Sequence, residues 1–530
     1  MSADSPPGLK PAAGRGVPAP QPEQQGRHRS VVLAVVLLAV LVVSMDNSIL
    51  YVALKTLAEP APTGLGANQG QLQWAVDAYT LAYAGLLLTA GVLGNRGWHK
   101  RLLLAGLASF AAFSTLSAFC KHPAELIACR AAMGFAAAFI MPATLAIVTR
   151  AFPGEARVRA IGIWSAVVGA ALAIGPLVAG ALLERFWWGS VFLVNVPVVA
   201  MAVPTIWSFV PELAEAERRR LDPVGITLAG AGLLGFVYGV IRAGDLGSWA
   251  VPEVYLPIAA GLVLLGSFAV LERRASEPAL DVRYFADRGF SSSVLALGAL
   301  FFALFGGTFV MTFYLQSVRG YSALRAGACI LPLAGAMIAF APNAPALVRR
   351  FGARSVSTAG MLAVATALAG LASLQRSTGI WFFEVVLFVF GAGMAHVLPP
   401  TTARIVATLP EGQAGTSSAV NNTFRQVGGA IGIAVLGSVL ASTYRSRVAP
   451  EVGALPPSVR APAESSVTAT LQALHAAGHS AQRLVLPVQD AFMRAMHITW
   501  LVATGAMLVA AFSMFFMSRP AATSSSHAKG

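Results

Sequence analysis

The feature that most constrains this chain is a succession of apolar runs, each near the length that crosses a lipid bilayer. A membrane-spanning helix needs about 20 mostly apolar residues, and 14 such runs can be identified. Because backbone polar groups in lipid must be satisfied within the segment, the runs predict an all-α polytopic membrane protein. The expected spans are residues 31–51, 74–94, 102–120, 124–149, 160–183, 191–210, 223–241, 254–271, 291–315, 324–347, 356–374, 380–399, 427–441 and 496–516.

The charge of the chain is best explained by membrane topology. Only 11% of residues are charged, against about 25% in soluble proteins. The net charge of +14 would suit a nucleic-acid-binding protein, but the basic residues are spread between the apolar runs. We therefore expect no nucleic-acid partner. The three cysteines lack metal-ligand spacing, so we expect packing residues, with no metal, cofactor or disulfide framework.

The loops indicate how the chain is oriented and divided. Most Lys and Arg residues fall on the side of the N-terminus, which predicts that this side is cytoplasmic. An even number of spans returns the C-terminus to the cytoplasm. Residues 1–30 are rich in Pro, Gly and Gln and are expected to be a disordered cytoplasmic tail. Residues 519–530 are expected to be a second cytoplasmic tail. Residues 443–495 form the long external loop.

A faint internal repeat suggests two related halves. The basic turn GNRGWHK at 94–100, after span two, resembles RRFGAR at 349–354, after span ten. If these turns are equivalent, residues 31–210 and 291–518 are two six-helix halves, and residues 211–290 hold an inserted helix pair with its flanking loops. Two halves that rock about a midplane cavity would give alternating access.

The fifth span carries small residues along one face. In IGIWSAVVGAALAIGPLVAG, at 161–180, small residues allow close helix packing, and Gly175-Pro176 weakens the hydrogen-bond ladder. We interpret Gly175 and Pro176 as a conformational element; ordinary kinked packing is the alternative. The stretch resembles the antiporter signature of drug exporters in the major facilitator superfamily.

Further stretches resemble the 14-helix drug:proton antiporter family of that superfamily. The resemblance covers about residues 31–518 and implies the major facilitator fold, with 14 transmembrane helices and no enzymatic activity. It implies proton-coupled export of amphipathic drugs, antibiotics or dyes across the cytoplasmic membrane. The stretches are MDNSIL at 45–50, QWAVDAY at 73–79, RAAMG at 130–134, WGSVFLVNVP at 188–197, GYSALRAG at 320–327 and GTSS at 415–418.

Two departures from the family pattern affect the expected mechanism. The loop after span two has Asn95, next to Arg96, where the family usually has an acid that pairs with basic residues. An asparagine can cap a helix but cannot form the ion pair. Positions that hold acids in some exporters of dications are uncharged here, which argues against a specifically dicationic substrate. These positions are Met337, Asn421, Asn422 and Gln426.

Three charged residues lie within the outer part of the first spans. A charge inside a membrane span is costly and is a functional candidate by default. Our hypothesis is that Asp46 carries the coupling proton and that Arg130 adjusts the pKa of Asp46. Asp77 would then attract a cationic substrate or share the proton. The alternatives are a structural ion pair between Asp46 and Arg130, and a solvated side chain at Asp77.

Several further residues are candidates for substrate binding. Aromatic and polar side chains can accept drug rings, and a histidine can titrate near neutral pH; packing against lipid or other helices is the alternative for each. Arg425 is expected at the inner mouth of span thirteen, with its charge reaching lipid phosphate. The candidates are Trp74, Tyr79, Tyr314, Gln316, Glu384 and His396.

Two other functions remain open at this point. One is a transporter of a defined metabolite, such as a siderophore or an amino-acid derivative. The other is a membrane-embedded enzyme, for which His122 and Glu125 are the nearest constellation. The chain has no phosphate-binding G-x-x-x-x-G-K-[ST] loop. We therefore expect a secondary transporter that acts as a monomer, with an amphipathic substrate, protons and the lipid bilayer as its partners.

Overall fold

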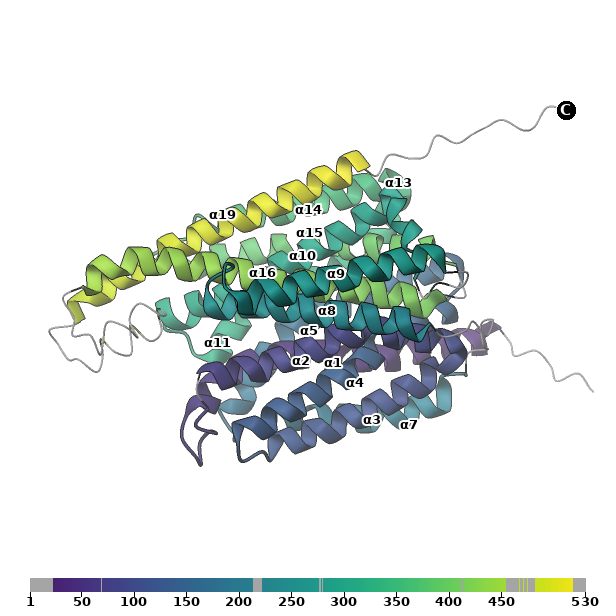
Figure 1. The fold of residues 1–530 in the computed structure, drawn as a ribbon, viewed down its shortest axis with the longest axis horizontal. Coiled ribbons are helices and arrows are strands. Elements are labelled where there is room, and N and C mark those ends of the chain that lie inside the picture. Colours follow the sequence, from purple (N-terminus) through teal and green to yellow (C-terminus); the bar gives the residue numbers. More distant parts are fainter. Residues whose placement is uncertain are drawn as a thin grey trace, which may run out of the picture.

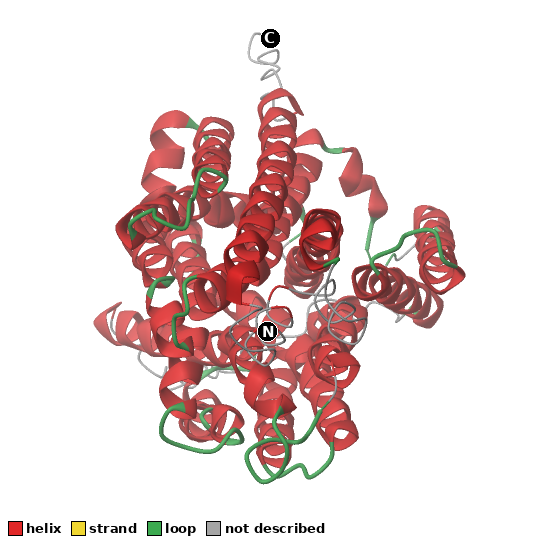
Figure 2. Ribbon diagram, turned by 90° about the vertical axis from the view of Figure 1, so that its left-hand side faces the viewer, coloured by secondary structure: helices red, strands yellow, loops and turns green. Residues whose placement is uncertain are grey.

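The structure, a computed structural model, is helical throughout its regular elements. It describes residues 22–67, 69–212, 222–275, 280–410, 413–453 and 482–517, and the single residues 278, 467, 470 and 474. Every regular element in these ranges is a helix, and Figure 2 shows the long helices nearly end-on. Most of the expected N-terminal tail (residues 1–21), the whole of the expected C-terminal tail (519–530) and much of the expected external loop lie outside these residues.

Seven helices form an N-terminal group. Between α2 and α3 the chain turns through a π-helical segment, Gly94–Trp98, in which Gly97 has a φ of 84°. Glycine is the residue that adopts this left-handed conformation without a steric cost. The helices are α1 (Pro22–Ala58), α2 (Gln69–Leu93), α3 (His99–Ala118), α4 (Pro123–Ala151), α5 (Gly154–Leu183), α6 (Ser190–Leu193) and α7 (Asn195–Phe209).

A helix pair and a C-terminal group follow. The pair is α8 (Pro223–Leu246) and α9 (Pro252–Arg274). The C-terminal group contains α10 (Arg288–Phe313), α11 (Ala323–Ala328), α12 (Leu331–Phe340), α13 (Ala344–Phe351), α14 (Ala353–Leu371), α15 (Ile380–Thr408), α16 (Ala414–Val452) and α19 (Val485–Met517). A second π-helical segment, Tyr314–Val318, extends α10.

The predicted fold class is confirmed, because each expected span lies mainly on helical chain. Within the described residues, 13 helices are long and apolar enough to cross a membrane. One of them, Gly70–Ala118, includes the turn at Gly97 and so contains two of the expected spans. The count is therefore consistent with 14 transmembrane helices.

Four boundaries differ from the sequence prediction. Helix α1 begins at Pro22, so the last part of the expected tail is helical. Helix α16 is 39 residues long, and α19 begins at Val485; both therefore extend into the expected loop 443–495. The tenth span is broken into α11, α12 and α13, with Pro332 and Pro345 in the first turns of α12 and α13. Hydropathy underestimated the length of α16, because its first turns are polar and yet are buried against other helices.

The helix pair lies between the two groups (Figure 1). Helix α8 packs on α2 of the N-terminal group and on α16 of the C-terminal group, while α9 packs mainly on α8. We call the end of the bundle with the α2–α3 turn the basic end, since it holds Arg96, Lys100 and Arg101. There Lys100 Nζ donates to the carbonyl of Trp207 (2.8 Å).

Small residues on α5 bring the two groups into contact. A Cβ added at Gly162 would lie 3.0 Å from the carbonyl oxygen of Ala341, and one at Gly169 would lie 2.7 Å from the Met337 side chain. Near the other end of α5, a Cβ at Gly327 would lie 2.8 Å from the backbone nitrogen of Leu177. Two small residues of the fifth span, Gly162 and Gly169, thus pack against the C-terminal group.

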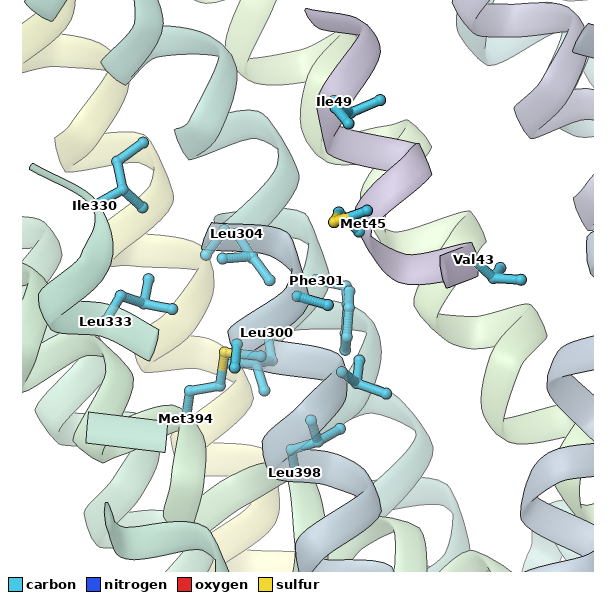
Figure 3. Close-up of a cluster of buried hydrophobic side chains, with 14 of the residues drawn as sticks. Val43, Met45, Ile49, Leu300, Phe301, Leu304, Ile330, Leu333, Met394 and Leu398 are labelled. Carbon is cyan, nitrogen blue, oxygen red and sulfur yellow. The ribbon is translucent and has the colours of Figure 1, made fainter. Parts of the chain in front are cut away.

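Apolar side chains fill the space between the groups. Val43, Met45 and Ile49 on α1 belong to one buried cluster with residues of α10, α12 and α15. Figure 3 shows these side chains together with Phe301 and Leu304 of α10 and Met394 and Leu398 of α15. The core is therefore continuous from one group to the other.

We predict that Gly432→Ala destabilises the protein by about 1–3 kcal/mol, the usual cost of overpacking. An added Cβ there would collide with the backbone of Phe302 on α10, which cannot move aside easily. The matched control is Gly437→Ala, on the same helix, where the Cβ would lie 3.7 Å from Phe309. Thermal unfolding in detergent micelles should separate the two variants, and equal stability would contradict the packing described here.

Candidate functional site

A buried ion pair joins α1 and α4. Arg130 Nη1 lies 2.6 Å from Asp46 Oδ2, and the two side chains are 1% and 0% exposed. An isolated charge in such surroundings would be very costly, and each residue supplies the opposite charge that the other requires. The sequence predicted both residues as candidates, and the structure brings them together.

Asn195 donates a second hydrogen bond to the Asp46 carboxylate. Its Nδ2 donates to Asp46 Oδ1 (3.1 Å) and lies equally close to Ser114 Oγ. Ser114 in turn donates to the carbonyl of Phe192 (2.8 Å). Asn195 begins α7, just after the break between α6 and α7. Asn195 was not predicted as a site residue, although a lone amide within an apolar run was a usable signal.

Helix α2 supplies the other contacts of the guanidinium. Arg130 Nε donates to the carbonyl of Ala75 (3.2 Å), and its Cζ lies 4.3 Å from the centre of the Tyr79 ring. Gly134 permits this approach, since a Cβ there would lie 2.9 Å from Tyr79 Cα. Tyr79, predicted as a drug-binding residue, is fully buried and covers the arginine.

Gly175 allows α5 to pack directly against α1, the helix that carries Asp46. A Cβ at Gly175 would lie 2.8 Å from the carbonyl of Met45 and would collide with Ser48 Oγ. The adjacent Pro176 contacts Gly327 of the C-terminal group. The Gly175-Pro176 step therefore lies between the helix that carries Asp46 and the other half of the bundle.

A small cavity lies beside this step. Its volume is about 20 Å³, enough for one water molecule. Tyr51, on its wall, also interacts electrostatically with Asp77 and Arg130, which links the cavity to the ion-pair region. Gln316 is the predicted binding residue found in the lining, which comprises Ser48, Tyr51, Val52, Pro176, Thr308, Thr312, Leu315, Gln316, Ala326, Gly327 and Ile330.

The other predicted binding residues lie elsewhere. Trp74 packs against Tyr238 of α8, with ring centres 6.1 Å apart, and Tyr314 packs against Phe383 at 5.9 Å. His396 Nδ1 lies 2.6 Å from the carbonyl of Ala392 in its own helix, which fits the packing alternative. Glu384 is partly buried on α15.

Asn95 connects the two groups at the basic end. Its Oδ1 accepts from the backbone N–H of Gly415 (2.8 Å), and its Nδ2 donates to Thr416 Oγ1 (2.7 Å). The side chain thus caps the first turn of α16. Arg96, beside it, is partly buried in the π-helical turn.

The expected position of Arg425 is wrong. The side chain does not reach a lipid headgroup: it is 7% exposed, and it lies against the rings of Trp164 and Phe301. The reason is the length of α16, which begins at Ala414, so that Arg425 lies well inside the helix. Arg425 was therefore not predicted to be a buried cation or a site residue.

Glu125, which with His122 was considered as an enzyme site, caps the start of a helix. Glu125 Oε2 accepts backbone N–H groups from Lys121 (2.8 Å) and His122 (3.3 Å) at the start of α4. This carboxylate satisfies donors that a helix N-terminus leaves unpaired.

Comparisons with known proteins all point to one protein family. The model of the Major Facilitator Superfamily matches residues 36–433. The tetracenomycin C resistance and export protein of Streptomyces glaucescens is 32% identical, over 93% of this chain and 92% of its own length. The multidrug efflux pump LfrA of Mycolicibacterium smegmatis is 34% identical, over 91% and 94%. The crystal structure of the human organic anion transporter MFSD10 has a TM-score of 0.60 at 16% identity, covering 93% of this chain and all of that one.

The ion pair makes a prediction about stability. Asp46→Asn alone leaves Arg130 buried without its counter-charge and should destabilise the protein by about 3–5 kcal/mol. The double variant Asp46→Asn/Arg130→Gln removes both charges and should recover much of that loss. The measurement is thermal unfolding of the purified protein in detergent.

The exposed pair between Arg376 and Asp490 (3.3 Å) is the matched control. Asp490→Asn should cost at most about 1 kcal/mol, as is usual for surface pairs. A double variant at the buried pair that is no more stable than Asp46→Asn would contradict the interpretation.

Proposed function

Because the chain belongs to the major facilitator superfamily, we propose that it exports amphipathic drugs, antibiotics or dyes across the cytoplasmic membrane in exchange for protons. Its relatives of 32–34% identity include an antibiotic export protein and a multidrug efflux pump, each matched over more than nine-tenths of this chain. Those similarities support export as the direction of transport and a small organic molecule as the substrate. The chain is a transporter, and it acts without catalysing a reaction.

The observation that carries the proton-coupled part of the proposal is the buried pair of Asp46 and Arg130. A proton on Asp46 neutralises the carboxylate, so the charge of Arg130 loses its partner. An uncompensated buried charge is costly, and the guanidinium must then gain water or another partner. Protonation at one atom is thereby coupled to the packing of α1 against α4.

We propose that the Gly175-Pro176 step passes this change to the C-terminal group. Gly175 contacts α1 beside Met45 and Ser48, and Pro176 contacts Gly327 of α11. A shift of α1 that follows protonation would press on α5 at a level where proline weakens its hydrogen-bond ladder. Helix α5 would then change its contact with α11.

Opposite ends of the bundle would serve as two gates. At the basic end, Asn95 and Gly415 hold α2 to α16. At the other end, Pro176 and Gly327 hold α5 to α11. The cavity of about 20 Å³ is far smaller than a drug-sized site of about 300 Å³ or more. We propose that substrate enters when one gate separates, and that Gln316 and Asp77 then face it.

The orientation proposed from the sequence places the basic end in the cytoplasm. Basic loops concentrate on the cytoplasmic side of membrane proteins, and the turns after α2 and α13 carry such residues. With 14 spans, both termini are cytoplasmic. A monomer contains both groups of helices, so we propose that one chain is the transport unit.

The experiment uses inside-out vesicles with an acidic interior and an internal pH dye. Drugs of cationic, neutral and anionic type are added outside, where they meet the cytoplasmic face. We expect drug-dependent proton release in the native protein and at least a tenfold loss of its rate in Asp46→Asn/Arg130→Gln. The double variant is preferred to Asp46→Asn because it leaves no unpaired buried charge.

Asp490→Asn, at the exposed pair, is the control and should keep the native rate. Protease added to the same vesicles should remove a C-terminal tag if that terminus is cytoplasmic. Proton release retained in the double variant would show that the ion pair is structural only. No release with any drug, from protein present in the membrane, would favour a dedicated metabolite transporter.

A further inference from the structure

A second buried cation lies where the two groups of helices meet. Arg425 of α16 is 7% exposed, and its Cζ lies 5.5 Å from the ring centre of Trp164 and 4.5 Å from that of Phe301. Trp164 belongs to α5 in the N-terminal group, and Phe301 to α10 in the C-terminal group. A transporter that works by alternating access binds its substrate between its two halves. The guanidinium therefore lies at the interface that such a substrate would occupy.

The charge of Arg425 has no counter-ion among the residues that the structure describes. Its Nη1 donates to the amide oxygen of Asn422 (3.1 Å), while its Nε is buried without a partner. The described titratable side chain that interacts with it electrostatically is the phenol of Tyr83, which is neutral at physiological pH. Arg130 in the other group, by contrast, has a carboxylate at 2.6 Å.

Two aromatic rings compensate for only part of the cost of burying this charge. Cation–π contacts stabilise a guanidinium modestly, whereas a carboxylate matches its donors in both charge and geometry. Trp164 is itself held in place, since its Nε1 donates to Thr144 Oγ1 (3.2 Å). The rings thus form fixed walls beside a cation that still has an unused donor.

Other polar groups on the same helix are also unpaired. Ser418, Asn421 and Asn422 precede Arg425 at spacings of seven, four and three residues, which places them along one face of α16. Ser418 Oγ and Asn421 Oδ1 are buried without a partner in the described part of the chain, as is Gln426 Nε2 beside the arginine. Buried polar groups are normally hydrogen-bonded. Of these atoms, the Ser418 hydroxyl and the Arg425 Nε lie on one face of α16 and can both donate, so they suit a ligand that accepts hydrogen bonds.

We propose that Arg425 is the centre of a substrate subsite for an acidic group, a carboxylate or an ionised phenol, carried on an aromatic ring. The acid accepts hydrogen bonds from the guanidinium, and the attached ring packs against Trp164 and Phe301. The subsite rests on the proposed function and adds to it that the exported compounds include aromatic acids.

The test compares two probes of equal shape, 2-naphthoate and its neutral amide, 2-naphthamide. Binding to the purified protein in an uncharged detergent is measured by calorimetry. We expect the native protein to bind the acid about tenfold more tightly than the amide, the effect of one charge-assisted hydrogen bond. Equal affinity, or tighter binding of the amide, would overturn the proposal without any variant.

Two variants then assign the preference to Arg425. Arg425→Gln should remove the tenfold preference because it weakens binding of the acid more than binding of the amide. Arg425→Lys should keep part of the preference because it keeps the charge. Arg425→Gln removes a buried charge that has no counter-ion, so it should fold at least as stably as the native protein. A preference for the acid that persists in Arg425→Gln would also overturn the proposal.

The binding assay needs no proton gradient, so its outcome is separate from that of the vesicle experiment. Selective binding of naphthoate without drug-driven proton release would refute proton-coupled export and support the subsite. Drug-driven proton release without a preference for naphthoate over the amide would support export and refute the subsite.

Discussion

The structure of the N-terminal group depends on placing one negative and one positive charge together in a medium that tolerates neither alone. Asp46 and Arg130 belong to different helices, so α1 and α4 must come within hydrogen-bonding distance. The remaining hydrogen-bonding groups then need partners, which α7 supplies with Asn195 and α2 with the carbonyl of Ala75. A pair built in this way is stable only while both charges are present. The coupling proposed above rests on this property, because a proton on Asp46 would remove one of the two charges that hold these four helices together.

Small residues determine which helices pack closely against those that hold the ion pair. Gly134 brings α4 against the backbone of α2, and Gly175 brings α5 against α1. On its other side α5 contacts the C-terminal group, at Gly327 and Met337. Lipid provides no hydrophobic force between helices, so close packing of small residues has to provide the attraction. Helix α5 thus packs against both the helix that carries Asp46 and the opposite group.

The parts of the structure that could be predicted from the sequence are those in which lipid is the neighbour. Apolar length located the spans, and the cost of charge in a membrane marked Asp46 and Arg130. Hydropathy failed where protein is the neighbour: it shortened α16, whose buried first turns are polar, and so placed Arg425 at a surface. The direction in which a side chain points could not be predicted from the sequence either. Composition marks Trp74 and Gln316 alike as candidates for a pocket, but only the packing of α2 against α8 turns Trp74 away from the cavity that Gln316 lines.

The central claim is that Asp46 gains and loses a proton during transport. Isotope-edited infrared spectroscopy of the carboxyl groups, on the protein in lipid vesicles, measures this directly. The account predicts a band of a protonated carboxylic acid that grows as the pH falls, diminishes when substrate binds, and is missing from Asp46→Asn/Arg130→Gln. A carboxylate at Asp46 that stays ionised over the whole pH range of transport, with and without substrate, would contradict it. The ion pair would then be a structural link, and the coupling proton would have to be carried by another residue.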